Sequence, residues 1–205
     1  MNKRLFALAT LMATIVFTIA STLVASTTPR IKETGSTSDT DNQQAEAAKP
    51  AVAANPADVK SIDAILAALY DVISGPAGKK RDWDRFRSLF VAGARLIPAA
   101  KRPDGVFEAR VLDPDGYVKR AAPFLEEQGF YEREISRKVD QFGQIAHVFS
   151  TYDSRHTAED KTPFARGINS IQLLNDGKRW WIVTIYWDSE RPDNPLLPQY
   201  LPSSK

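Results

Sequence analysis

The sequence predicts an α+β domain in which helical segments come first and a meander of four antiparallel strands follows. In the first half, apolar residues recur at three- and four-residue spacing between capping residues, which is typical of helices. From Phe130 onward the spacing changes to two, the period of a strand with one covered face. Asp176-Gly177 between two apolar runs is a strong hairpin signal. Because helices and sheet each carry an apolar face, each is expected to cover the other.

Three helices are expected. The first begins at Asn55-Pro56, since Asn is a good N-cap and Pro suits the first helical position, and it ends before Gly75-Pro76. A second, shorter helix fits residues 82–90, and a third runs from Asp113-Pro114 to a stop at Gly129. The apolar face of the first helix holds Val59, Ile62, Ile65, Leu66, Leu69, Tyr70 and Ile73.

Strands are expected in two places. A short hairpin over residues 94–112 turns at Pro103-Asp104-Gly105, a typical turn sequence. The four strands of the meander are expected at residues 130–142, 144–156, 165–174 and 179–189.

The N-terminal segment is expected to direct export. Lys3 and Arg4 precede an uncharged, largely apolar run over residues 5–25, which is typical of a signal peptide. We favour cleavage at the small residues near Ala20, Ala25 or Ser26. Because roughly 20 apolar residues can span a bilayer, a retained inner-membrane anchor is the alternative. In both cases the folded part is expected outside the cytoplasm, either periplasmic or secreted.

The expected domain organisation follows from composition. Residues 1–25 form the signal or anchor, and residues 26–56 form a tether, because they contain too little apolar surface to support a fold. The folded domain is expected over residues 57–190, and residues 191–205 form a Pro-rich tail that packs along the surface.

Charge and residue types argue against several classes of function. The net charge is +2, and without Lys3 and Arg4 the basic and acidic residues are equal at 25 each, which argues against a nucleic-acid partner. The chain has no cysteine, so neither disulfides nor thiolate metal sites are expected. Its two histidines are not part of an HExxH motif, and no metal site is expected. No phosphate-binding or dinucleotide-binding motif occurs, and no cofactor is expected.

One stretch, FARGINSIQLLNDGKRWWIV over residues 164–183, resembles the NTF2-like (SnoaL-like) superfamily of bacterial α+β domains. The resemblance also rests on the order of elements over residues 58–190. It implies a cone in which three N-terminal helices pack on a strongly curved, mostly antiparallel sheet of about six strands. It further implies a pocket open at one end and homodimers through the outer sheet face. The superfamily includes isomerases, cyclases, dehydratases and many members without known activity, so the fold leaves the function open.

A two-residue turn at Asp176-Gly177 predicts which residues share a face of the last hairpin. The side implied to face the helices carries Asn169, Thr184 and Tyr186, which are the expected polar contacts of a ligand in the pocket. Alternatively, Asn169 and Thr184 bond to each other and Tyr186 reaches solvent. The opposite side holds Trp181 and Trp187 and is the expected homodimer surface.

For the other candidate site residues, the sequence pattern gives less information about which way the side chain points. Tyr70 is expected to face the pocket from the first helix, and Trp83 either lines the mouth of the pocket or packs in the core. His147 is the candidate catalytic residue, because a histidine can transfer protons near neutral pH, although its face is undetermined and a structural role is the favoured reading. Glu132 and Glu134 are interpreted as a solvated strand face that pairs with lysines or arginines.

The favoured function is an extracytoplasmic, non-catalytic domain that binds a small apolar or amphipathic molecule in the cone as a homodimer. The first alternative is a SnoaL-like enzyme that carries out proton transfer in an isomerase, cyclase or dehydratase reaction. The second is an accessory or scaffold protein that acts through its outer sheet face. The reason for favouring binding is that no acid–base set is apparent in the sequence.

Overall fold

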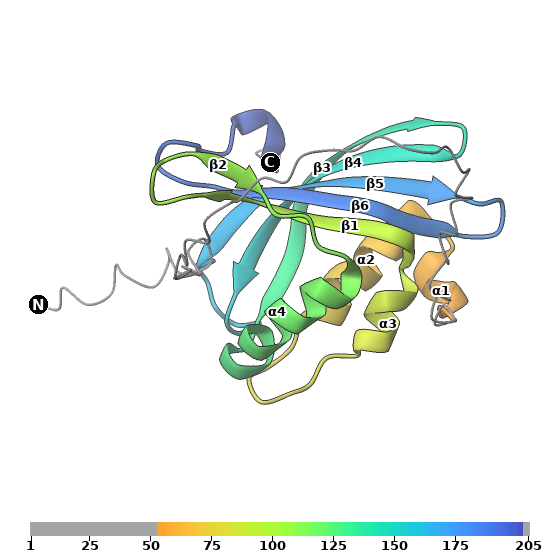
Figure 1. The fold of residues 1–205 in the computed structure, drawn as a ribbon, viewed down its shortest axis with the longest axis horizontal. Helices are drawn as coiled ribbons and strands as arrows, with labels where there is room; N and C mark the ends of the chain where they lie inside the picture. The colour runs from red at the N-terminus through yellow and green to blue at the C-terminus, as the bar shows by residue number, and fades with distance from the viewer. Residues whose placement is uncertain (1–52, 203–205) are drawn as a thin grey trace, which may run out of the picture.

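The computed structural model describes residues 53–202, which form two layers (Figure 1). Four helices lie on one side of a six-stranded sheet. The helices are α1 (Pro56–Val59), α2 (Ile62–Ile73), α3 (Trp83–Ser88) and α4 (Pro114–Gln128). The strands are β1 (Phe90–Lys101), β2 (Phe107–Ala109), β3 (Tyr131–Phe142), β4 (Ile145–Arg155), β5 (Ala165–Asn175) and β6 (Trp180–Ser189).

The strand order across the sheet is β2-β1-β6-β5-β4-β3. The meander of β3 to β6 is antiparallel throughout, as expected, and β1 adds to it in parallel with β6. Strand β2 pairs antiparallel with the end of β1, which confirms the short hairpin. The α+β class and the number of strands are therefore confirmed, and the sheet is mixed.

The helical part differs from the expectation of three helices. The segment expected as a first helix is divided into α1 and α2, because Ser61 adopts an extended conformation and its hydroxyl accepts a hydrogen bond from the backbone of Ala64. Ser61 is therefore an N-cap within the segment. Helix α1 begins with the expected cap, since the side chain of Asn55 accepts from the amide of Ala57.

The core lies between the helices and the inner face of the sheet. Its members with the least exposure include Ile65 and Leu66 of α2, Phe86 of α3, and Ile171 and Ile182 of the sheet. No helix within residues 53–202 is both long and apolar enough to cross a bilayer. The segment expected at 1–25 and nearly all of that expected at 26–56 lie outside the described residues.

The last hairpin departs from the expected register in two ways. Its turn has four residues, since Asn175 pairs with Trp180, and the carboxylate of Asp176 accepts hydrogen bonds from the amides of Lys178 and Arg179. A β-bulge follows, because Leu173 pairs with Ile182 whereas Gln172 pairs with Thr184, and this leaves Val183 as an extra residue.

The bulge reverses the faces of β6 beyond Val183. Trp180 and Ile182 face the helices and Trp181 faces outward, as expected. Beyond the bulge, Ile185 pairs with Ile171, and Trp187 pairs with Asn169, on the helix-facing side. Thr184 and Tyr186 are consequently on the outer face, and the prediction that both point towards the helices was wrong.

The C-terminal segment returns over the outer face of the sheet. Its short 3₁₀ helix η1 (Pro198–Tyr200) lies on the side opposite the four α-helices (Figure 1). The backbone carbonyl of Tyr200 accepts a hydrogen bond from the hydroxyl of Thr151 at 2.7 Å, and the Tyr200 ring lies 5.1 Å from that of Phe149. The described part of the tail is thus packed on the surface.

Candidate functional site

Two of the residues expected in the pocket meet on the helix-facing side of the sheet. Tyr70 comes from α2 and Asn169 from β5, and the Nδ2 atom of Asn169 donates a hydrogen bond to the Tyr70 hydroxyl at 3.2 Å. Both residues are buried. The hydroxyl of Tyr70 is also 2.7 Å from Oγ of Ser150 on β4. These contacts join the helical layer to the middle of the sheet through polar groups.

Glu132 of β3 completes this arrangement, although it was interpreted as part of a solvated strand face. Its Oε2 atom accepts a hydrogen bond from Ser154 at 2.9 Å, and its Oε1 atom lies 3.4 Å from Nδ2 of Asn169. The backbone amide of Glu132 donates to the hydroxyl of Ser74 at 3.0 Å, which holds β3 against the end of α2. The side chain therefore points to the helices, and the prediction of a solvated position was wrong.

Burial gives Glu132 unusual proton chemistry. Desolvation raises the pKa of its carboxyl to about 7, and the negative charge of Asp153 adds to this rise. The hydrogen bonds from Ser154 and Asn169 act in the opposite direction but do not cancel it. A carboxyl with this pKa can hold or release a proton near neutral pH, which is the property required of a general acid or base.

Two further tyrosines lie close to Glu132. Burial raises the pKa of the hydroxyls of Tyr117 on α4 and Tyr152 on β4, and the nearby charge of Glu132 contributes to both increases. The ring of Tyr117 stacks on Phe86 and meets the ring of Trp187 edge-on at 6.2 Å. We call this group the Glu132 cluster; it consists of Tyr70, Tyr117, Glu132, Ser150, Tyr152, Ser154 and Asn169.

The members of the Glu132 cluster differ in how much surface they expose. Glu132 and Tyr117 are only half-buried, whereas Ser150 and Ser154 have almost no exposed surface. Within residues 53–202 the Tyr117 hydroxyl makes no hydrogen bond to protein, and it is not among the fully enclosed polar atoms. Tyr117 and Glu132 are therefore the members of the cluster with the most exposed surface.

A second carboxyl lies next to the cluster on the same strand. Ser150 donates a hydrogen bond to Oε2 of Glu134 at 2.5 Å, and Nε of Arg137 lies 3.2 Å from Oε1 of Glu134. Arg137 also pairs with the exposed Asp63 at 2.6 Å. Glu134 is thus paired with an arginine, as expected, but it lies on the helix-facing side of β3 and not on a solvated face.

Gly167 provides the space that Tyr152 needs. A Cβ atom at this position would lie 2.5 Å from the hydroxyl of Tyr152 and 2.4 Å from the carbonyl oxygen of Asp188. Any side chain would therefore clash with both. Because Gly167 has no side chain, the Tyr152 hydroxyl can approach the hydroxyl of Ser189 at 3.3 Å.

The remaining sequence candidates lie away from the cluster. His147 is on the outer face, where its Nε2 atom is 2.9 Å from Oγ of Ser170. Trp83 is at the margin between α3 and α4, where its indole donates to Glu126 at 2.8 Å. Thr184 and Tyr186 are on the outer face, and Trp187, expected there, packs instead on Tyr117.

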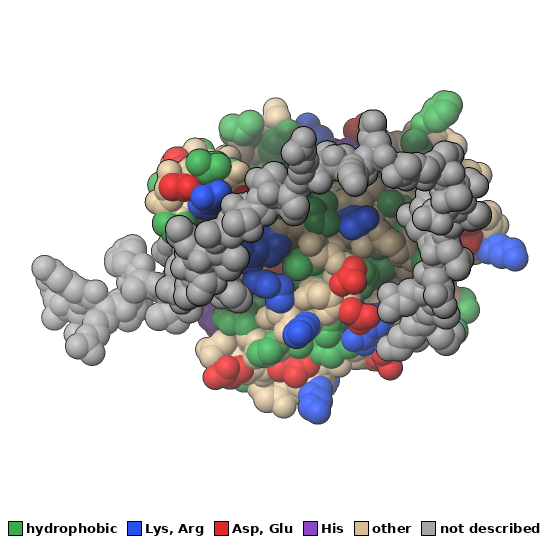
Figure 2. Space-filling model, in the orientation of Figure 1, with side chains coloured by type: hydrophobic (Ala, Val, Ile, Leu, Met, Phe, Trp, Pro, Cys, Tyr) green, Lys and Arg blue, Asp and Glu red, His purple; other side chains and the backbone are tan. Residues whose placement is uncertain are grey.

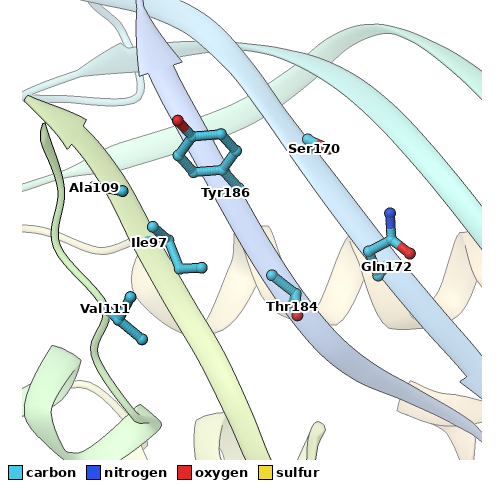
Figure 3. Close-up of a pocket in the computed structure, with 7 residues that line it drawn as sticks. All are labelled: Ile97, Ala109, Val111, Ser170, Gln172, Thr184 and Tyr186. Atoms are coloured by element: carbon cyan, nitrogen blue, oxygen red, sulfur yellow. The ribbon is translucent and has the colours of Figure 1, made fainter. Parts of the chain in front are cut away.

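The outer face has a shallow groove of its own. Its volume is about 400 Å³, and Figure 3 shows Tyr186, Thr184 and Gln172 projecting from neighbouring strands on the side away from the helices. The other residues that line it are Ile97, Ala109, Val111 and Ser170. The polar residues expected inside the cone are therefore partly found in this external groove.

Charge is distributed without a single dominant sign. Figure 2 shows basic and acidic side chains interspersed over the face in view. Within residues 53–202, no group of three or more His, Asp or Glu side chains is placed to hold a metal ion. The chemistry available to the Glu132 cluster is that of its carboxyl, hydroxyl and amide groups.

The fold is similar to that of solved NTF2-like and cystatin-like proteins. A protein of unknown function with a cystatin-like fold from Nostoc punctiforme has 13% identity and a TM-score of 0.46, and the match covers 64% of this chain and 89% of that one. An NTF2-like protein of unknown function from Silicibacter pomeroyi has 14% identity and a TM-score of 0.45, with coverages of 64% and 94%. A third, from Caulobacter vibrioides, is an uncharacterised protein with a cystatin-like fold that has 14% identity and a TM-score of 0.46, with coverages of 65% and 90%. No protein-family model matches the sequence, and no curated protein matches it.

Proposed function

We propose that this domain binds a small molecule on the helix-facing side of its sheet, at the Glu132 cluster. The observation that carries the proposal is that two half-buried residues, Glu132 and Tyr117, lie within electrostatic reach of each other beside a buried hydrogen-bonded network. Small-molecule sites are usually lined by apolar side chains, with a few polar groups that point toward the ligand. Ile185 and Leu125 belong to the apolar core between the helices and the sheet, and Trp187 packs against it.

The rest of the network supports binding because it fixes the polar groups in advance. Tyr70, Ser150 and Asn169 are held by hydrogen bonds of 2.7 Å and 3.2 Å, so their side chains have little freedom to lose when a ligand enters. Tyr117 and Glu132 are the cluster members with the most exposed surface. The expected ligand therefore contacts these two residues most directly.

Native mass spectrometry of the protein purified gently from its own host tests this proposal. We expect one small molecule per chain in the wild-type protein, and its loss in Glu132→Gln and Tyr117→Phe. The matched control is Tyr186→Phe, since Tyr186 is a tyrosine of the outer face and should leave the bound mass unchanged. A bound molecule that persists in both cluster variants and is lost in the control would place the site on the outer face instead.

Acid–base catalysis at the same site is the second candidate. It is favoured by the pKa of Glu132, about 7, in a cluster that also holds hydroxyl groups able to donate to a developing negative charge. The test is to incubate the co-purified molecule with the protein in deuterated water. Deuterium entering a carbon position with the wild-type protein but not with Glu132→Gln would support a proton-transfer enzyme, and no exchange would favour simple binding.

We also propose a homodimer through the outer sheet face, with Trp181 rather than Trp187 on that surface. A row of polar residues crosses this face from β1 to β3 and carries opposite charges at its two ends. Its members, in order, are Arg95, Thr184, Gln172, His147 and Asp140. A two-fold axis near Gln172 would bring Arg95 of one copy to Asp140 of the other, which is a self-complementary arrangement.

We also propose that the domain is located outside the cytoplasm. Lys3, Arg4 and the apolar run over residues 5–25 support export, with the folded domain either released or held at the inner membrane. A reporter fusion that is active only outside the cytoplasm tests it, and an active cytoplasmic reporter would contradict it.

A further inference from the structure

Within residues 53–202, several buried or half-buried carboxylates are paired with arginines, and Glu132 differs from them. Asp153, 5% exposed, is paired with Arg133 at 3.0 Å and with Arg155 at 2.9 Å. Two partly buried carboxylates follow the same pattern: Asp58 pairs with Arg85 at 2.8 Å, and Glu190 pairs with Arg166 at 2.7 Å. A charge removed from water normally requires such a partner.

The partners of Glu132 in the described chain are all neutral. They are the hydroxyl of Ser154 and the amide of Asn169, and no basic side chain within residues 53–202 forms an ion pair with it. The next carboxylate on the strand, Glu134, does have a basic partner in Arg137. Within the described residues, Glu132 therefore lacks the positively charged partner that a carboxylate removed from water normally has.

Three tyrosines lie within electrostatic reach of the unpaired carboxyl. The charge of Glu132 contributes, after burial, to the raised pKa values of Tyr70, Tyr117 and Tyr152, so all three phenols lie within its electrostatic reach. Trp187 adjoins Tyr117 edge-on. Aromatic faces attract cations, and a carboxylate among them provides the charge that complements an ammonium group.

We infer that the Glu132 cluster takes a small organic cation, whose ammonium group replaces the missing countercharge beside the Glu132 carboxylate. This inference rests on the binding site proposed above and names the class of its ligand. The cation contacts the aromatic rings of the cluster through its alkyl groups, and the hydroxyl of Tyr117 accepts or donates a hydrogen bond to a polar substituent.

The pH dependence of binding distinguishes a cation from a neutral ligand. A cation requires ionised Glu132, so its affinity rises as pH increases through the pKa of this residue, whereas a carbonyl ligand that accepts from protonated Glu132 shows the opposite trend. The titratable and charged groups near Glu132 on the helix-facing side are Tyr70 of α2, Tyr117 of α4, Glu134 and Arg137 of β3, and Tyr152 of β4. Asp153 of β4 acts on Glu132 from the opposite face of the sheet. The tyrosines stay protonated over this range because burial raises their pKa values.

Isothermal titration with choline and its uncharged isostere, 3,3-dimethylbutan-1-ol, tests the inference. Choline is a permanent cation, so only the protein titrates. At about pH 8.5 we expect choline to bind at least roughly tenfold more tightly than the alcohol, and to weaken by roughly tenfold or more at about pH 5.5. Changes in the side-chain amide resonances of Asn169 on addition of choline place it in the cluster.

Two variants complete the experiment. Glu132→Gln should reduce the affinity for choline to that for the alcohol, while the exposed Glu159→Gln should leave both affinities unchanged. Equal binding of choline and the alcohol by the wild-type protein would overturn the cation inference and leave the binding site in place. Failure of both molecules to bind, together with no co-purifying molecule in the mass spectrum, would overturn the inference and the proposed function together.

Discussion

The Nδ2 atom of Asn169 lies 3.4 Å from Oε1 of Glu132, and this contact joins β5 to β3 across the intervening strand. It depends on the inner-face positions of both residues, which are set by the pairing of β4 with its two neighbours. An amide and a carboxyl that lie far apart in the sequence thus form the centre of one polar cluster.

The first prediction concerns stability and pH. The folded pKa of Glu132 is about 7, above its ordinary value of 4.5, so the folded state binds more protons than the unfolded state between these two values. The free energy of unfolding should therefore contain a contribution from Glu132 that decreases as pH rises through this window. Glu132→Gln removes the contribution, and the variant should gain stability relative to wild type on going from about pH 5 to about pH 8.

Urea unfolding at several pH values measures this difference, with Glu159→Gln as the control. The free energy of unfolding of the control variant should change with pH in the same way as that of the wild type, because Glu159 is exposed. A constant difference between Glu132→Gln and wild type across the range would show that Glu132 titrates alike in the folded and unfolded states.

The second prediction concerns the hydroxyl of Tyr70. Tyr70→Phe removes the acceptor of the Asn169 amide and a hydrogen-bond partner of Ser150, and both groups are buried. We expect the free energy of unfolding to decrease by about 1–3 kcal/mol in urea denaturation. Tyr186→Phe, at a position 45% exposed on the outer face, should stay within about 0.5 kcal/mol of wild type. Equal effects of the two changes would contradict the assigned hydrogen bonds.

The third prediction tests the reversal of faces at Val183. The chain has no cysteine, so single cysteines introduced at positions 185 and 186 are the only thiols present. Ile185 is 5% exposed and Tyr186 is 45% exposed. The variant Tyr186→Cys should react rapidly with a maleimide in the folded protein, and Ile185→Cys should react only after unfolding. The reverse order of reactivity would indicate a strand without the bulge.

The elements themselves were largely predictable from the sequence, because local signals determine them. Asp113-Pro114 and Gly129 bound α4 as expected, and the period of two located all four strands of the meander to within a few residues. The division of the first helix was missed, since Ser61 stands within an unbroken apolar period and its role as a cap is visible only in its backbone conformation.

The site was predicted only in part. Tyr70 and Asn169 were expected in the interior and lie there, because neither position is affected by the bulge. Thr184, Tyr186 and Trp187 were assigned to the wrong faces, since one extra residue at Val183 reverses every position after it. Sequence alternation gives no sign of such an insertion when both faces are apolar.

Glu132 was missed for a different reason. In the stretch Tyr131–Ile135 three charged residues follow one another, with Glu132 and Glu134 on one face and Arg133 on the other, and this pattern favoured a solvated strand. The available signal was that Glu132 and Glu134 share one face of β3, the face without Arg133, in a sheet expected to be covered by helices. Which face is covered depends on tertiary packing.

The fourth prediction concerns the proposed homodimer. If Arg95 of one copy meets Asp140 of the other, Arg95→Glu should shift the protein to monomers in sedimentation velocity runs, because like charges would then face each other. The double change of Arg95→Glu with Asp140→Lys should restore the dimer. A wild-type protein that sediments as a monomer at every concentration would contradict the proposal.

The most direct test of the Glu132 cluster is a titration of the Glu132 carboxyl by carbon-detected NMR, with Glu132→Gln used to assign the resonance. The protein should be free of ligand for this experiment. We predict a midpoint near pH 7, because the carboxyl is desolvated and lacks a basic partner within the described chain. A midpoint near the ordinary value of 4.5 would mean that the carboxyl is solvated or already paired, and it would remove the basis for a ligand site at this position.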